Sequence, residues 1–141
     1  MRLTEDNIAD YADTLVRRVR DGGIDLDYSV ASLTTLENLI RSSDDAFRSP
    51  DLTDFQRDIS VFYPGCYLGE VLARNLGGVW RFEEDWPESS LVFSRQDGTG
   101  VQCFPFRKMF RRVTEGPEEN DLTAYFRELS LRIAGGIPDL P

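Results

Sequence analysis

YPGCYLGEVLARNLGGVW, residues 63–80, is the most apolar and most sharply bounded segment of the sequence. Pro64 lacks a backbone N–H, and proline is tolerated best at the first position of a helix. The segment therefore predicts a break or kink at Pro64, followed by a new helix over residues 64–76. Because apolar side chains cover nearly all sides of this helix, we expect it to be buried in the centre of the fold.

Two glycines end this helix, and a strand follows them. We expect Gly77 or Gly78 to adopt the left-handed conformation that terminates helices. Residues 79–84 are predicted to form the first strand. Small residues recur at every fourth position inside the helix, at Gly65, Gly69 and Ala73. We expect this stripe to let another part of the backbone approach closely.

Glu70 stands out in this helix, because a buried carboxylate must be paired or protonated. Arg74 follows it by four residues, in the order that favours an ion pair on a helix. One interpretation is a structural ion pair. The alternative is a functional carboxylate, which would make the protein a small enzyme or an anion-binding protein that uses Glu70 and nearby arginines.

The run YLGEVLARNLGGVW resembles the core motif of small bacterial domains of unknown function, in which Gly-x-Tyr-Leu-Gly-Glu-Val precedes Asn-Leu-Gly-Gly-x-Trp. Upstream, DLDYSVASLTTLENLI at residues 25–40 resembles the helix start of the same group, so the resemblance covers about residues 25–110. It implies a small α+β fold. Some of these domains are encoded near polymorphic-toxin or secretion loci, which implies an immunity or accessory role. No catalytic residue is carried over.

The composition is that of one small acidic domain over residues 1–141, with 40% hydrophobic residues for a single core. No apolar run is long enough to span a membrane, and the acidic N-terminus does not resemble a secretory signal. We therefore expect a cytoplasmic protein. The net charge of −9 opposes binding to nucleic acid or to anionic membranes and favours a basic protein partner.

The absence of histidine removes the commonest general base and the commonest metal ligand. The two cysteines, Cys66 and Cys103, are far apart in the sequence and are predicted to be buried free thiols. We expect no metal site and no cofactor. No Walker, GxSxG or GxGxxG pattern is present. These features favour a non-catalytic protein.

Hydrophobic spacing and turn residues predict the other elements. The N-terminal helices are expected over residues 5–20, from a cap at Asp27 or Ser29 to residue 41, and over residues 54–62 with Phe55, Ile59 and Phe62 inside. The remaining strands are expected over residues 91–95 and 101–106. Short links between strands make the sheet an antiparallel meander. Two helices follow, the second capped by Asp121, before a frayed tail at residues 137–141.

These predictions give an α+β fold. N-terminal helices and a central buried helix precede a three-stranded antiparallel sheet, and C-terminal helices close the domain. Four basic residues follow the sheet within six positions, at Arg107, Lys108, Arg111 and Arg112. We expect them on one exposed helical face, with Phe106, Phe110 and Val113 inward. This face is either a solvated surface or a docking site for an acidic protein or a phosphate-bearing ligand.

The N-terminal half has the opposite charge, with thirteen Asp and Glu against seven Arg in residues 1–60. Its loop at residues 42–53 holds Asp44, Asp45 and Asp51, interpreted as solvated charges or as a docking surface for a basic partner rather than as a metal site. An apolar patch around Trp86 or Phe47 is the alternative partner surface. The expected function is a non-catalytic protein-binding domain of the bacterial cytosol. A small enzyme and a homodimer are the alternatives.

Overall fold

The computed structural model describes residues 2–135 and shows the predicted α+β fold. The helices are α1 (Ile8–Asp21), α2 (Ser32–Arg41), α3 (Asp44–Phe47), α4 (Asp54–Leu76), α5 (Pro105–Glu115) and α6 (Leu122–Ile133). The strands are β1 (Val79–Arg81), β2 (Ser90–Ser94) and β3 (Gly100–Cys103), with the short 3-10 helix η1 (Trp86–Glu88) between the first two. The frayed tail predicted at residues 137–141 lies outside the described residues.

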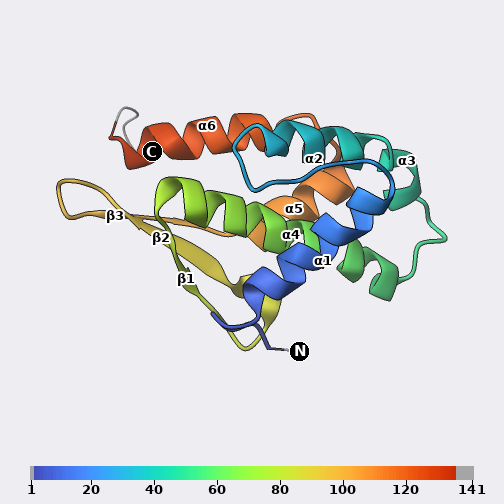
Figure 1. Ribbon diagram of the computed structural model, residues 1–141, viewed down its shortest axis with the longest axis horizontal. Helices are drawn as coiled ribbons and strands as arrows, with labels where there is room; N and C mark the ends of the chain where they lie inside the picture. Colours follow the sequence, from blue (N-terminus) through green and yellow to red (C-terminus); the bar gives the residue numbers. More distant parts are fainter. Residues whose placement is uncertain (1, 136–141) are drawn as a thin grey trace.

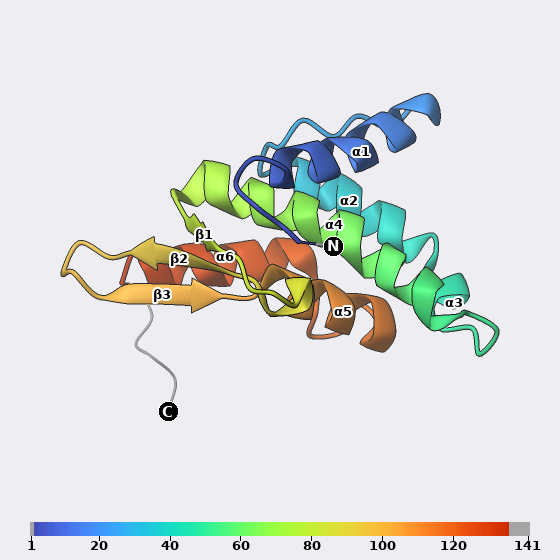
Figure 2. The same ribbon diagram turned by 90° about the horizontal axis from the view of Figure 1, so that it is seen from below.

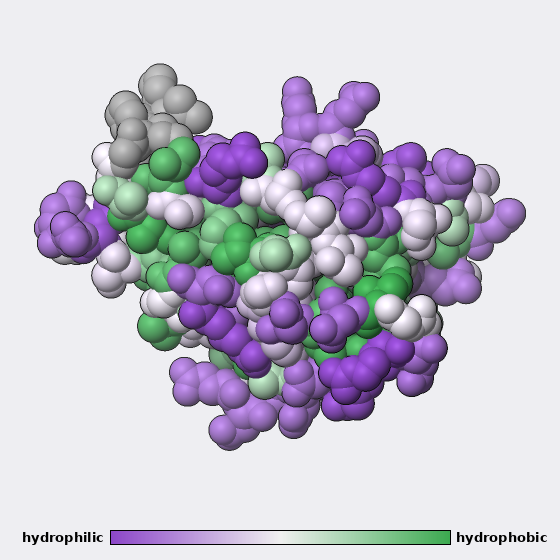
Figure 3. Space-filling view, turned by 45° about the horizontal axis from the view of Figure 1, so that its top comes forward, coloured by the Kyte–Doolittle hydropathy of each residue, from purple (hydrophilic) through white to green (hydrophobic). Residues whose placement is uncertain are grey.

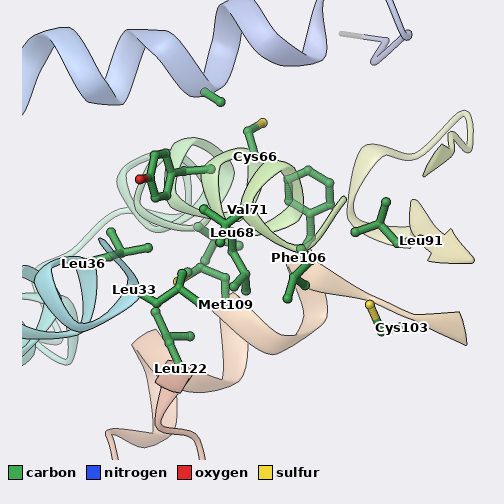
Figure 4. Packing of buried hydrophobic residues seen from close by; sticks show 14 of the residues in the cluster. Leu33, Leu36, Cys66, Leu68, Val71, Leu91, Cys103, Phe106, Met109 and Leu122 are labelled. Carbon is green, nitrogen blue, oxygen red and sulfur yellow. The ribbon is translucent and has the colours of Figure 1, made fainter. Parts of the chain in front are cut away.

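Helix α4 is the central element of the fold. Figure 2 shows α1 along one side of α4, with α5 and the sheet along the other, and Figure 1 shows α2 and α6 together above it. Every residue from Gly65 to Leu72 is buried, so the predicted central buried helix is confirmed. Its side chains reach several neighbouring elements: Cys66 points toward α1, and Leu68 lies on the side of α2 and α5 (Figure 4). Cys66 and Cys103 are buried free thiols, as predicted.

The break expected at Pro64 is wrong, because α4 continues through this residue without interruption. A proline inside a helix costs about 3 kcal/mol through its missing hydrogen bond and its steric clash. The buried turns that follow it offset this cost by packing against the rest of the core. The helix also begins at a strong cap, since the Thr53 hydroxyl accepts a hydrogen bond from the Gln56 N–H at 3.1 Å and the Gln56 side chain accepts one from the Thr53 N–H.

Other predictions about α4 are partly confirmed. Gly77 ends the helix with a φ of 78°, as expected. The glycine stripe admits aromatic rings rather than backbone, because a Cβ at Gly65 or Gly69 would lie 2.5 Å from the Phe106 ring or 2.2 Å from the Trp80 ring. Burial in α4 begins only at Val61. The inward positions predicted for Phe55 and Ile59 are therefore wrong, since both side chains are exposed, whereas Phe62 is buried.

The sheet is the predicted antiparallel meander, in the order β1-β2-β3. Trp80 lies opposite Leu91, and Leu91 lies opposite Cys103. The outer strands are shorter than predicted, and β3 stops at Cys103 because Pro105 already begins α5. The loop predicted over residues 42–53 contains the short helix α3. Within residues 2–135, no helix is both long enough and apolar enough to cross a membrane.

Candidate functional site

Arg112 is fully buried, which contradicts its predicted place on the exposed basic face of α5. Its guanidinium donates to the Glu37 carboxylate of α2, from Nε at 2.9 Å and from Nη2 at 2.6 Å. It also donates from Nη1 to Asp44 of α3 at 2.8 Å. The N–H of Leu122, the first residue of α6, donates to Glu37 as well, at 3.1 Å. This buried ion pair thus joins α2, α3, α5 and α6, and its role is structural.

The rotation of α5 accounts for this error. Met109 and Val113 are fully buried, whereas Phe110, predicted inward, is about half exposed. The buried face is therefore turned toward Arg112, which needs a carboxylate partner there. The partner of Arg112, Glu37, was not predicted. Its position did indicate a buried carboxylate, because it lies on the apolar stripe of α2 between Leu33 and Ile40.

The three aspartates of the acidic loop differ from one another. Asp44 binds the buried Arg112 and lies 3.8 Å from Arg48, so it is not a free docking charge. Asp45 and Asp51 are exposed, as a docking surface requires. In the part of the chain that the structure describes, no three His, Cys, Asp or Glu side chains are arranged to hold a metal ion.

Glu70 is buried, and both of its carboxylate oxygens accept hydrogen bonds. Oε1 accepts from Arg74 at 3.1 Å, so the predicted ion pair is present. Oε2 accepts from Trp80 Nε1 at 3.0 Å, a partner that the sequence analysis missed because the chain must turn back through Gly77 to bring it there. The Arg74 guanidinium lies 3.8 Å over the Tyr28 ring, which ties the α1–α2 link to α4.

We expect Glu70→Ala to lower the free energy of unfolding by about 1–3 kcal/mol, because the Trp80 indole N–H loses its buried acceptor. The loss is smaller than for a fully buried ion pair, since Arg74 is 43% exposed and can be hydrated. Urea denaturation measures the effect. Glu70→Gln is the matched control, because it keeps an acceptor for Trp80 and should lose less. An unchanged midpoint for Glu70→Ala would contradict the structural role.

The other three members of the predicted basic cluster do come together. Arg107, Lys108 and Arg111 line a groove of about 320 Å³ between β3, α5 and α6. Arg132 of α6 adds a fourth cation, which no sequence pattern linked to the cluster, and Glu128 is the one carboxylate of the lining. We call this the basic groove.

Trp86 borders a second pocket, of about 420 Å³, between α4, η1 and α5. Its apolar walls are Val61, Trp86, Pro87, Phe106 and Phe110. The Trp86 ring is partly exposed and packs edge-on against Phe62 and Phe106, with centroid distances of 5.0 and 5.1 Å. We call this the Trp86 pocket.

Carboxylates border one side of the Trp86 pocket and the surface next to it, whereas Arg107 and Arg111 line the side formed by α5. The carboxylates come from α4 and from the link between β1 and β2, and they are Asp58, Glu83, Glu84, Asp85 and Glu88. Glu88 pairs with Arg107. Within residues 2–135, the other four have no ion-pair partner. We call these five residues the acidic rim. Of this surface, only Trp86 was predicted from the sequence.

A further apolar surface lies on the face that carries α2 and α6, between charged side chains (Figure 3). A pocket of about 360 Å³ separates these helices, and the exposed side chains of Val30 and Leu131 line it. A second copy of the chain could bind at this surface. The homodimer hypothesis stays a prediction.

Comparison with known proteins finds no relative, since no protein-family model, no curated protein and no solved structure matches the chain. The resemblance to small bacterial domains of unknown function therefore stays a prediction.

Proposed function

We propose that this protein is a non-catalytic domain of the bacterial cytosol that binds a basic protein partner at the Trp86 pocket, in an immunity or accessory role. The observation that supports this proposal is the combination of an apolar pocket with the four carboxylates of the acidic rim that have no ion-pair partner within residues 2–135. A partner that binds here would contact the apolar pocket and the carboxylates of the rim at the same time.

The pocket suits a long basic side chain of the partner. A lysine or arginine buries its alkyl stem against apolar surface and keeps its charged head outside. Here the stem would contact Trp86 and Phe110, and the head would meet Asp58 at the border of the pocket. Glu88 is already paired with Arg107, and Arg107 and Arg111 line the side of the pocket that α5 forms. Tryptophan is among the residues that most often contribute large binding energies in protein interfaces.

The charge of the rim favours the same class of partner. Neighbouring carboxylates repel one another, and a basic protein relieves that repulsion when it binds. The net charge of −9 adds a longer-range attraction that raises the association rate. The alternative function, an enzyme that uses Glu70, is less well supported because both carboxylate oxygens of that residue are already hydrogen-bonded.

The test is to capture partners from a lysate of the source bacterium and to measure their binding to variants. We expect a basic protein whose association slows as salt rises, because salt screens exposed charges. Glu84→Lys with Asp85→Lys should reduce its association rate at least about tenfold. The matched control, Asp45→Lys with Asp51→Lys, reverses two exposed charges elsewhere and should have a much smaller effect.

Three results would contradict the proposal. An acidic partner would exclude the rim as the docking surface. A larger effect of the control reversals would move the site to the acidic loop. Capture of the chain itself, with a dimer mass in sedimentation, would favour the homodimer.

A further inference from the structure

The basic groove carries the opposite charge to the acidic rim. Its lining includes the cations Arg107, Lys108, Arg111 and Arg132 and the single carboxylate Glu128. Arg132 is bound to Glu128 at 2.6 Å, and Arg107 is bound to Glu88 of the rim. Arg111 and Lys108 are therefore the cations whose charge is least compensated, since the ion pair of Arg111 with Glu115 is long, at 3.7 Å, and exposed.

Lys108 is the only lysine in the sequence. Its ammonium group lies 4.9 Å from the centre of the Tyr125 ring and donates a long hydrogen bond, 3.4 Å, to the Glu119 carbonyl. No carboxylate within residues 2–135 forms an ion pair with it. Burial lowers the pKa of Lys108, and the neighbouring charge of Arg111 lowers it further. The groove thus holds a partly buried positive charge that an anion would stabilise.

The groove follows the margin of the sheet. In the described part of the chain, β3 pairs with β2 alone, and Figure 2 shows it as the outermost strand, which leads into α5. The last three residues of β3, from Val101 to Cys103, and the following Phe104 line the groove. Successive side chains of a strand point to opposite faces of the sheet. A groove that is lined by successive residues therefore runs along the edge of the strand, where both faces meet. An edge strand presents N–H and C=O groups that lack a partner strand.

We propose that the basic groove binds an extended acidic segment of a partner protein, which adds to the sheet as a fourth strand beside β3. The backbone of the segment would pair with the edge of β3. Every second side chain would then point toward the cations of α5 and α6, and these side chains would be Asp or Glu. Strand addition of this kind takes its affinity from main-chain hydrogen bonds and its specificity from alternate side chains.

The dimensions define the ligand more closely. Three residues of β3 and the following Phe104 line the groove, so about three or four residues of the segment can pair there. Side chains on one face of a strand repeat about every 6.6 Å, which is two residues. The expected motif is therefore acidic-x-acidic in an extended segment without proline. This surface and its partner are independent of the proposed function, which concerns a basic protein at the Trp86 pocket.

The main comparison uses the wild-type chain and three capped hexapeptides, so its result does not depend on the folding of variants. The first is Thr-Glu-Val-Glu-Val-Glu, the second has Gln in place of each Glu, and the third keeps Glu but carries N-methyl groups on alternate amides. Fluorescence anisotropy measures their affinities. Reductive ¹³C-methylation of Lys108 gives one side-chain NMR signal that reports contact at the groove itself.

We expect the Glu peptide to bind and to shift the Lys108 signal. The Gln and N-methyl peptides should bind at least about tenfold more weakly, because each lacks one of the two required interactions. The double variant Lys108→Gln with Arg111→Gln should bind the Glu peptide more weakly than the wild type by a similar factor. Arg17→Gln with Arg20→Gln, two exposed arginines of α1, is the matched control and should leave binding unchanged within about twofold.

Each other outcome overturns the proposal. Equal binding of the N-methyl peptide would exclude strand addition, and equal binding of the Gln peptide would exclude recognition of charge. A Lys108 signal that responds to inorganic phosphate but to none of the peptides would make the groove a site for small anions.

Discussion

Arg112→Met is expected to lower the free energy of unfolding by about 3–5 kcal/mol, because it leaves a carboxylate buried without its main partner. Glu37 is only 3% exposed, and its remaining side-chain partner, Arg41, is half exposed. Asp44 loses its shorter ion pair in the same step. Guanidinium denaturation followed by tryptophan fluorescence measures the change.

The neighbouring arginine of α5 provides the control. Arg111→Met removes the same charge from the same helix at an exposed position, and we expect a change within about 0.5 kcal/mol. In the double variant Glu37→Leu with Arg112→Met, both charges of the pair are gone. Its loss should be much smaller than the sum of the two single losses. A loss below about 1 kcal/mol for Arg112→Met would show that the pair is not buried as described.

Phe106→Ala is also expected to cost about 3–5 kcal/mol, through lost burial and the cavity left behind. The Phe106 ring is fully buried and fills the space that Gly65 leaves open on α4. It also packs against Trp80 and Trp86, with centroid distances of 6.0 and 5.1 Å. Thermal and urea denaturation measure the loss.

Phe110→Ala is the matched control for this variant, because Phe110 lies one turn later on α5 and is 48% exposed. Its loss should be about 1 kcal/mol or less. Gly65→Ala should destabilise the wild-type chain, since its methyl group would meet the Phe106 ring at 2.5 Å. In the Phe106→Ala background the same change should stabilise, because the ring is gone and alanine favours helix by about 1 kcal/mol. Destabilisation in both backgrounds would contradict the packing described here.

Features set by neighbours in the sequence were predicted well. The helix end at Gly77, the meander and the cap of α6 all follow from local residues, and the Asp121 side chain accepts hydrogen bonds from the N–H groups of Thr123 and Ala124. The Glu70–Arg74 pair was predictable for the same reason, since four residues span one helical turn.

Features that depend on distant segments were missed or wrong. Arg112 and Glu37 are 75 residues apart in the sequence, and only the folded chain brings the two side chains together in the interior. Pro64 does not break α4, because burial of the following turns outweighs its local cost. The acidic rim joins Asp58 of α4 to the β1–β2 link, and no spacing rule connects those segments.

The buried pair also has a consequence for biosynthesis. A ribosome releases the chain from its N-terminus, and Glu37 is synthesised 75 residues before the arginine that neutralises it. At about 5–20 residues per second, the interval is roughly 4–15 seconds. During that time α2 cannot bury its carboxylate without a counter-charge, and α4 lacks the aromatic ring that covers Gly65. Nascent chains that stop before α5 should therefore stay open to proteases and chaperones, and the domain should become compact only when α5 and α6 have emerged.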